Sequence, residues 1–163
     1  MITCPYINIG FKSYETEKHA TVLGCDVSTN LPIKGHNLIF RSGKTILANL
    51  KPDGRFTIMA HYASDGYSPC IKVLGKWKRI TPIPKRAGLF PAILHDVLRQ
   101  YCTTPGCPWD RKFSDTMFYN ALRGGGESAS ISGAYYGAVS RTFGNIWFRM
   151  FHKTDPELSI ELI

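Results

Sequence analysis

The feature that most constrains the fold is a pair of helical patterns joined by a short run of helix breakers, over residues 90–122. The first pattern repeats apolar residues at helical spacing, and Pro91 fits its first turn, where a missing N–H costs nothing. Thr, Pro and Gly residues at 103–108 end it. Asp110 fits the N-cap of the second helix, and the glycines at 124–126 fit its end. We therefore predict two helices folded back on each other.

Two titratable residues stand at matching distances from that connection. His95 precedes it by about two helical turns and Asp115 follows Pro108 by about two turns, so each lies roughly 10 Å away. Antiparallel helices would bring the two side chains level. A histidine with a carboxylate in reach can hold one tautomer and act as a general base. His95 and Asp115 are therefore candidate catalytic residues; the alternative is an ordinary structural pair.

Two further carboxylates are candidate metal ligands. Asp96 directly follows His95, and it could bind a metal or stay solvated. Asp65 lies in a polar loop, 61–69, that can supply a carboxylate, a hydroxyl and backbone N–H groups to a metal or an oxyanion. The sequence identifies no cofactor, and calcium or another divalent cation is the candidate ion. For the loop, the alternative is a plain turn between a strand and a helix.

The rest of the chain predicts an α+β fold: a small antiparallel β-sheet in the N-terminal half, followed by a three-helix C-terminal half that contains the antiparallel hairpin. Short apolar runs at 37–40, 45–47 and 56–59 are separated by turn formers, Ser42-Gly43 and 52–54. With 163 residues the chain is expected to be one domain. Its expected parts are an irregular leader (1–19), a β-rich part (20–75), a helical part (87–151) and a tail (152–163).

Three details of that scheme are specific enough to check. A short strand is expected over residues 20–27. The third helix is expected over 127–151, beginning at Ser128 or Ser130, and Arg141 and Arg149 within it argue against a membrane span. Leu158, Ile160 and Leu162 alternate in the tail and could add a strand to a sheet.

The net charge indicates which binding partners are compatible with the chain. The net charge of +8 is consistent with nucleic acid, an anionic membrane surface or an acidic protein. The densest basic run, 76–79 with 85–86, surrounds Trp77; it could hold a phosphate or a base, or be a solvated linker.

Five cysteines without a CxxC pattern argue against a zinc site or a full disulfide framework. Cys102 and Cys107 could pair if oxidised; otherwise all five would be thiols in a reducing compartment. Residues 1–10 lack the pattern of a signal peptide.

Several stretches, in this order along the chain, resemble motifs of a phage and prophage family known as domain-of-unknown-function family 1353. They are SDGYSP (64–69), AILHDVL (92–98), SDTMFYNAL (114–122) and YYGAVSRTFG (135–144). The resemblance implies a phage origin and one site formed by Asp65, His95, Asp96 and Asp115. Three positions depart from the family pattern: Ser64 replaces a threonine, Tyr67 an alanine and Arg99 a tyrosine. The bulky Tyr67, or the arginine near His95, could crowd or alter the site, which leaves open a purely structural descendant.

The helix pattern is also distantly similar to phospholipase A2. That likeness implies His95 as a base acting through water, Asp96 on calcium and Asp115 orienting the histidine. The glycine-rich calcium loop, the tyrosine at position 99 and the cysteine framework of those enzymes are missing, so the likeness is analogy.

Two classes of function follow. The first is a virion-associated or assembly protein of a bacteriophage, in a head, neck, tail or baseplate, which binds other phage structural proteins or itself. The second is a metal-assisted His/Asp hydrolase that cleaves ester or amide bonds of lipids or the cell envelope. Expected locations are the virion or the host bacterial cytoplasm, where a factor that blocks a host defence would also act. Nucleic acid stays an open partner, and no transmembrane segment is expected.

Overall fold

The computed structural model describes residues 6–13, 16–64, 70–73, 76–79, 84, 86–140 and 157–163. The chain divides into two compact units. The first, which we call the sheet unit, comprises Met1–Asp65, Gln100–Pro108 and Asp155–Ile163; the second, the helical unit, comprises Gly66–Arg99 and Trp109–Thr154. Each unit takes segments from separate parts of the sequence, and the predicted single domain stays a prediction.

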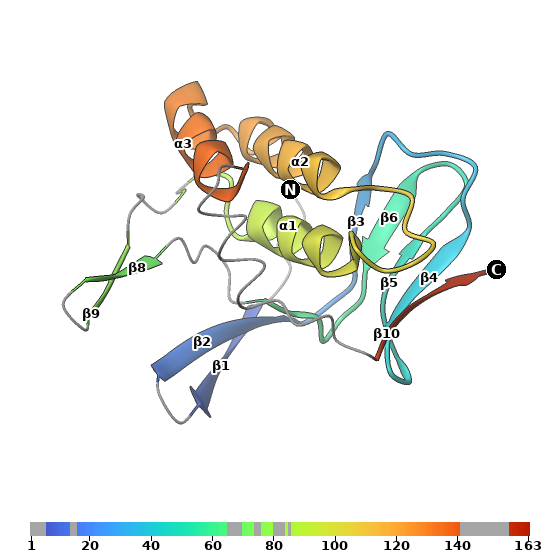
Figure 1. Ribbon diagram of the computed structural model, residues 1–163, viewed down its shortest axis with the longest axis horizontal. Coiled ribbons are helices and arrows are strands. Elements are labelled where there is room, and N and C mark those ends of the chain that lie inside the picture. The colour runs from blue at the N-terminus through green and yellow to red at the C-terminus, as the bar shows by residue number, and fades with distance from the viewer. Residues whose placement is uncertain are drawn as a thin grey trace. The chain divides into compact units, whose positions relative to one another are not determined.

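The sheet unit contains a five-stranded antiparallel sheet in the order β10-β4-β5-β6-β3 (Figure 1). Its strands are β3 (Val27–Asn30), β4 (Leu38–Ser42), β5 (Thr45–Leu50), β6 (Arg55–Ile58) and β10 (Leu158–Leu162). A second sheet has the order β1-β2-β7, formed by β1 (Tyr6–Ser13), β2 (Thr16–Leu23) and β7 (Ala63–Ser64). The predicted antiparallel sheet of the N-terminal half is confirmed, and its three apolar runs are β4, β5 and β6.

Alternating burial explains why these runs form strands. One face of β4, β5 and β6 is buried, with Leu38, Phe40, Ala48, Leu50, Phe56 and Ile58 all 5% exposed or less. The Phe40 ring packs edge-on against Phe56, with ring centroids 5.8 Å apart, and against Tyr101, at 5.1 Å. Side chains with this period of two bury one face of a sheet. The core of the sheet unit is therefore apolar and aromatic.

Gly54 shows how a turn fixes this sheet. Its φ of +91° lies in the left-handed region, which residues with a Cβ rarely adopt. A Cβ at this position would stand 2.6 Å from the carbonyl oxygen of Leu31. That approach is needed because Leu31 N donates a hydrogen bond to Gly54 O at 2.8 Å. The predicted turn at 52–54 thus also anchors the chain that enters β4.

The structure corrects two predictions at the N-terminus and confirms one at the C-terminus. Most of the leader expected to be irregular forms β1 and β2, whose strands pair from Tyr6↔Leu23 to Ser13↔Thr16. The strand expected over 20–27 is wrong in its bounds, because β2 ends at Leu23 and β3 begins only at Val27. The alternating tail does add a strand, since β10 pairs with β4 in the register Ile160↔Phe40.

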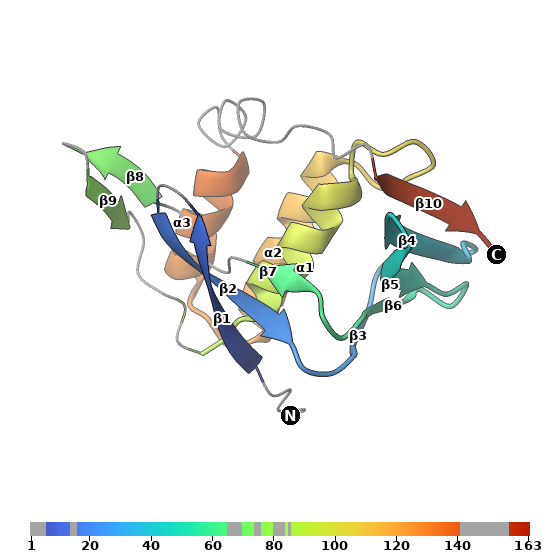
Figure 2. The ribbon, with the colours of Figure 1, turned by 90° about the horizontal axis from the view of Figure 1, so that it is seen from below.

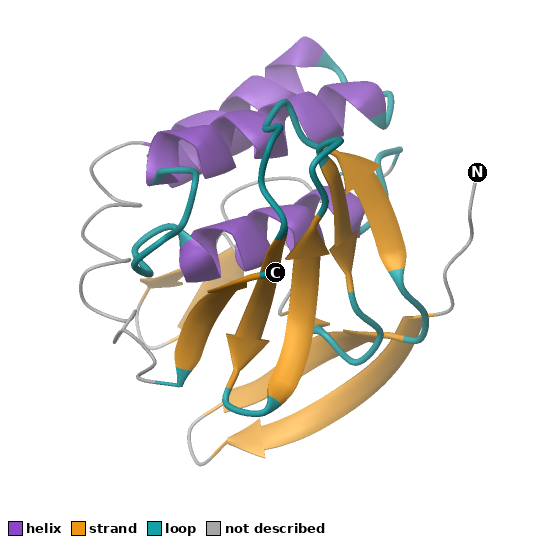
Figure 3. Ribbon diagram, turned by 90° about the vertical axis from the view of Figure 1, so that its right-hand side faces the viewer, coloured by secondary structure: helices purple, strands orange, loops and turns teal. Residues whose placement is uncertain are grey.

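The helical unit contains α1 (Phe90–Tyr101), α2 (Arg111–Gly124) and α3 (Ala129–Ser140), drawn in purple in Figure 3. The last two residues of α1 count with the sheet unit. The predicted hairpin is confirmed: Ala92 of α1 shares a buried apolar cluster with Phe118 and Leu122 of α2. A two-stranded ribbon, β8 (Cys70–Val73) with β9 (Lys76–Arg79), also belongs here. The basic run at 76–79 is therefore a strand and not a linker, although its side chains lie outside the described residues.

Helix ends follow the sequence closely. Asp110 is the N-cap of α2, and its Oδ1 accepts a hydrogen bond from Phe113 N at 2.8 Å. The helix ends in the predicted glycine run, where Gly125 N donates to Ala121 O and Gly126 has a φ of +88°. Ser128 precedes α3 and its Oγ accepts from Ile131 N, which favours Ser128 over Ser130 as the cap. The part of the third helix expected over 141–151 lies outside the described residues.

Cysteine pairing differs from both alternatives that the sequence offered. Cys25 is disulfide-bonded, so the alternative of five free thiols is wrong. Cys102 and Cys107 are not joined to each other by a disulfide.

Within the part of the chain that the structure describes, no helix has the length and apolar character needed to cross a membrane.

Candidate functional site

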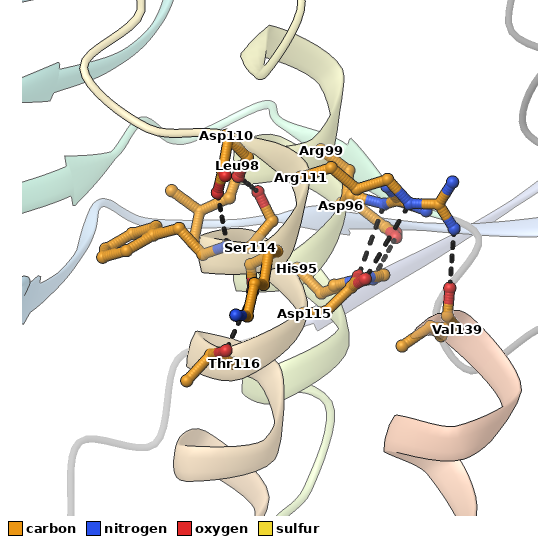
Figure 4. A network of polar contacts seen from close by, with 12 residues as sticks. His95, Asp96, Leu98, Arg99, Asp110, Arg111, Ser114, Asp115, Thr116 and Val139 are labelled. Atoms are coloured by element: carbon orange, nitrogen blue, oxygen red, sulfur yellow. Dashed lines mark hydrogen bonds and ion pairs between the residues drawn. The ribbon is translucent and has the colours of Figure 1, made fainter. Parts of the chain in front are cut away.

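The two candidate catalytic residues meet across the helix hairpin. His95 of α1 and Asp115 of α2 lie 2.9 Å apart, measured from Nε2 to Oδ1 (Figure 4). Both residues lie about two helical turns from the loop that joins the antiparallel helices, so their side chains stand at the same height, as the helix rise predicts. The structure thus places this pair in contact, while its catalytic role stays a prediction.

Apolar packing encloses the pair. The side chain of Asp115 is 4% exposed and that of His95 is 12% exposed. The imidazole lies 4.6 Å from the ring of Phe118, with the ring planes tilted by 30°. Phe118 in turn packs edge-on against Tyr135 of α3, with ring centroids 6.0 Å apart. A carboxylate taken this far from water needs polar partners, because its desolvation costs several kcal/mol.

Two arginines supply those partners, and neither was predicted as a site residue. Arg99 of α1 places Nε 3.6 Å from Asp115 Oδ1, and its side chain is 8% exposed. Arg111 of α2 places Nε 3.8 Å from Asp115 Oδ2, one helical turn away. Arg111 also donates from Nη2 to the carbonyl oxygen of Val139 at 2.9 Å, near the end of α3 (Figure 4). We call His95, Arg99, Arg111 and Asp115 the carboxylate clamp.

Burial sets the charge state of the histidine. Desolvation is the main cause that holds the pKa of His95 below its ordinary value of 6.5, and the hydrogen bond to Asp115 offsets it only in part. The positive charge of Arg99 lowers the His95 pKa further. The imidazole is therefore neutral at pH 7. Its contact with Asp115 is a charge-assisted hydrogen bond rather than an ion pair.

The short contact also fixes the tautomer. An ionised carboxylate only accepts hydrogen bonds, so the proton of the neutral ring must be on Nε2. The lone pair is then on Nδ1, which lies 3.9 Å from Oδ1 of Asp96. Asp96 is more open, with 29% of its side chain exposed. Chemically, the arrangement offers one oriented nitrogen that can accept a proton.

The predicted metal ligands are not brought together in the described residues. Among the residues that the structure places, no group of three or more His, Cys, Asp or Glu side chains could hold a metal ion. Asp65 lies outside the described residues. Asp65 and Asp96 as ligands of calcium or another divalent cation therefore stay a prediction.

A second buried carboxylate in the helical unit was also missed. Glu127 is 3% exposed and connects the end of α2 to the segment before α1. Its Oε1 accepts hydrogen bonds from the backbone N–H groups of Arg86 and Ala87, the latter at 3.2 Å. Its carbonyl oxygen accepts from Arg123. Because backbone donors satisfy this carboxylate, it serves the local fold.

The sequence carries a local signal for the carboxylate clamp. Arg111 and Asp115 are spaced i, i+4 on one helix, and so are His95 and Arg99 on the other. Residues four apart share a helix face. Once the hairpin is predicted, these spacings place both guanidinium groups on the side where His95 and Asp115 meet.

Comparison of the chain with protein-family models, with curated proteins and with solved structures gives no match. The resemblance to family 1353 and the analogy with phospholipase A2 therefore stay predictions.

Proposed function

We propose that this protein is a bacteriophage virion or assembly component that binds other proteins, and that its His/Asp site is structural. The observation that carries the proposal is the closed carboxylate clamp. Asp115 is contacted within its own helical unit by His95, Arg99 and Arg111. Groups that contact one another in this way hold helices in place, whereas a catalytic pair must also present itself to a substrate.

Two properties of His95 support a structural role. The lowered pKa makes the imidazole a weaker proton acceptor than an ordinary histidine near neutral pH. The side chain is also largely covered, at 12% exposure. A neutral histidine that donates one hydrogen bond to a buried carboxylate is typical of a polar network that specifies how helices pack.

The phage assignment depends on the resemblance to family 1353, and one further observation supports the virion over the cytoplasm. Cys25 is disulfide-bonded. Disulfides persist in oxidising surroundings, including virion surfaces, and are rare in the reducing cytoplasm. A protein carried outside the cell in a particle fits this chemistry.

Mass spectrometry of purified particles from a phage that encodes this chain is the direct test. We expect the protein to be present at a fixed stoichiometry to the major structural proteins. Its absence from intact particles would overturn the proposal.

A phage carrying His95→Gln separates structure from catalysis. The glutamine amide keeps an N–H donor for Asp115 and removes the proton-accepting ring nitrogen. We expect normal particle yield and infectivity with His95→Gln, and reduced yield with His95→Ala, which leaves the clamp incomplete. Full loss of infectivity with His95→Gln in a correctly folded protein would show that the ring nitrogen has a chemical role.

One observation favours a second candidate, a hydrolase. Because Nε2 donates to Asp115, the free Nδ1 lies beside Asp96, 3.9 Å from its Oδ1, where a water or a cation would have to be held. Purified protein assayed on phospholipid and ester substrates, with and without calcium, tests this candidate. Turnover that disappears in both His95→Gln and Asp96→Asn supports it, and equal turnover in those variants excludes it.

A further inference from the structure

The edge of the five-stranded sheet carries features that the helical site does not explain. β10 is the last strand of that sheet among the residues described, and Figure 2 shows it running along β4 toward the C-terminus. Its last residue, Leu162, is 81% exposed, and Ile163, which follows the strand, is 61% exposed; these are the most exposed large apolar side chains in the described chain. Edge strands in natural proteins are commonly protected by lysine, proline or a bulge, because their unpaired backbone groups attract another strand. The sequence of β10, LSIEL, has neither lysine nor proline.

Hydrogen bonding to β4 shows which backbone groups of β10 point outward. Gly43 N donates to Glu157 O, and Ile163 N donates to Asn37 O, so odd-numbered residues of β10 face β4. Successive residues of a strand alternate in direction. The N–H and C=O groups of Leu158, Ile160 and Leu162 therefore point away from β4, along the outer edge.

The strand is nearly symmetrical about its centre. Read in either direction, LSIEL presents leucine, a polar residue, isoleucine, a polar residue and leucine. We propose that a second copy of this chain pairs with the first through β10, antiparallel and centred on Ile160. Leu158 of one copy then lies opposite Leu162 of the other, and Ser159 lies opposite Glu161. The outward-facing backbone groups of Leu158, Ile160 and Leu162 meet their counterparts in this register, which joins two five-stranded sheets into one.

Apolar burial favours this register. Ile160 stands beside Phe40, and Leu162 beside Leu38, in the pairing of β10 with β4. Both partners are buried, so the apolar side of β10 continues the core face to the edge of the sheet. Leu162 is left uncovered there. In the proposed pair the leucine of the second copy lies directly beside it, at the separation at which cross-strand neighbours interact.

Charge on the other side of the strand is compatible with the same register. Glu161 pairs with Arg41, whose Nε lies 3.0 Å from Oε2. Opposite Glu161 the second copy presents Ser159, so no like charges oppose each other across the new pair. A single strand pair buries less than the 1,200–2,000 Å² or so of a standard interface, so we expect a weak dimer with a dissociation constant of about 1–100 µM.

Sedimentation velocity of the full chain, over protein concentrations below and above that range, tests the inference. We expect a reversible shift from monomer to dimer with rising concentration. Ser159→Glu is the deciding variant, because it sets like charges opposite each other at two symmetrical positions of the pair. Within one chain the same change places a carboxylate opposite Arg41, which also contacts Glu161, so we expect β10 to stay paired with β4. We expect its dissociation constant to rise at least tenfold, with an unchanged circular dichroism spectrum.

Ile160→Pro gives a second measure, since it removes an N–H that points outward and leaves the bonds to β4 in place. Wild-type protein that stays monomeric at every concentration overturns the inference, and so does a dimer that Ser159→Glu leaves intact. The inference does not rest on the virion role: the dimer is measured on purified protein, and the role is measured on particles.

Discussion

The sheet unit and the helical unit differ in how far their charged side chains are buried. In the sheet unit the ion pairs lie at the surface: Arg41 with Glu161 has side chains 25% and 52% exposed, and Arg55 with Asp53 has 61% and 57%. In the helical unit Asp115 is 4% exposed and His95 and Arg99 are nearly as covered. Exposed pairs contribute little because water and salt screen them, whereas a buried charge depends on each of its partners. The helical unit should therefore be the part of the molecule that is sensitive to single polar substitutions and to pH.

The largest expected effect comes from removing the buried carboxylate. Asp115→Ala leaves Arg99 and Arg111 without the charge that compensates them, and we expect the free energy of unfolding to fall by about 3–5 kcal/mol. Glu161→Ala removes the carboxylate of the exposed pair in the sheet unit, and there we expect about 0–1 kcal/mol. Urea denaturation of the two variants beside the wild type measures the difference.

Asp115→Asn is the matched control for that prediction, because it keeps the shape of the side chain and an oxygen that accepts from His95. We expect it to lie between the wild type and Asp115→Ala. If Asp115→Ala costs no more than Glu161→Ala, the contrast between the two units is wrong.

The second effect is a dependence of stability on pH. The folded-state pKa of His95 is lowered, whereas the unfolded chain has an ordinary value near 6.5. Below about pH 6.5 the unfolded state takes up a proton that the folded state refuses, so stability falls as pH falls toward the folded-state pKa. The slope is at most about 1.4 kcal/mol per pH unit, and the full stability is present above pH 6.5. Chemical denaturation at a series of pH values from 7.5 downward measures it.

His95→Gln should flatten that profile, since glutamine does not titrate. In the sheet unit the pKa of Asp53 is lowered chiefly by the backbone N–H of Arg55, so its stabilising effect is lost only below its ordinary value of 3.8. A pH profile that His95→Gln leaves unchanged between pH 7 and 5 would mean that another group controls the helical unit.

A third effect, smaller than that of Asp115→Ala, concerns a polar contact outside the clamp. Asp110→Ala removes the N-cap of α2, and we expect a loss of about 1 kcal/mol. The cap is exposed, so its removal should weaken the helix start without changing the pH profile. Hydrogen exchange should show faster exchange confined to the first turn of α2. A loss as large as that of Asp115→Ala would show that caps, and not the clamp, dominate the helical unit.

Sequence reasoning succeeded where local rules decide structure. The hairpin, the Asp110 cap and the glycine stop follow from neighbours within one or two turns, and the meeting of His95 with Asp115 follows from helix rise. The joining of the tail to β4 followed from alternation in one short segment. In each case the deciding interactions are close in sequence or repeat with a fixed period.

Sequence reasoning failed where a residue's contact partner is distant in the sequence, or where an alternating strand pattern was overlooked. Ile7, Ile9 and Phe11 alternate with polar residues or glycine, a strand pattern that the view of an irregular leader ignored. In the sequence Arg99 stands out only as a departure from the family pattern, because its ion pair requires a carboxylate from another helix. The disulfide of Cys25 depends on how the chain folds in space, and an odd number of cysteines concealed it.

At the centre of the helical unit a neutral His95 donates from Nε2 to a buried Asp115. An NMR titration of the histidine ring signals, assigned by comparison with His95→Gln, tests it most directly. We expect His95 to titrate below the ordinary value of 6.5, with the proton of the neutral ring on Nε2. A ring that titrates at or above 6.5, or a neutral form protonated on Nδ1, would contradict it.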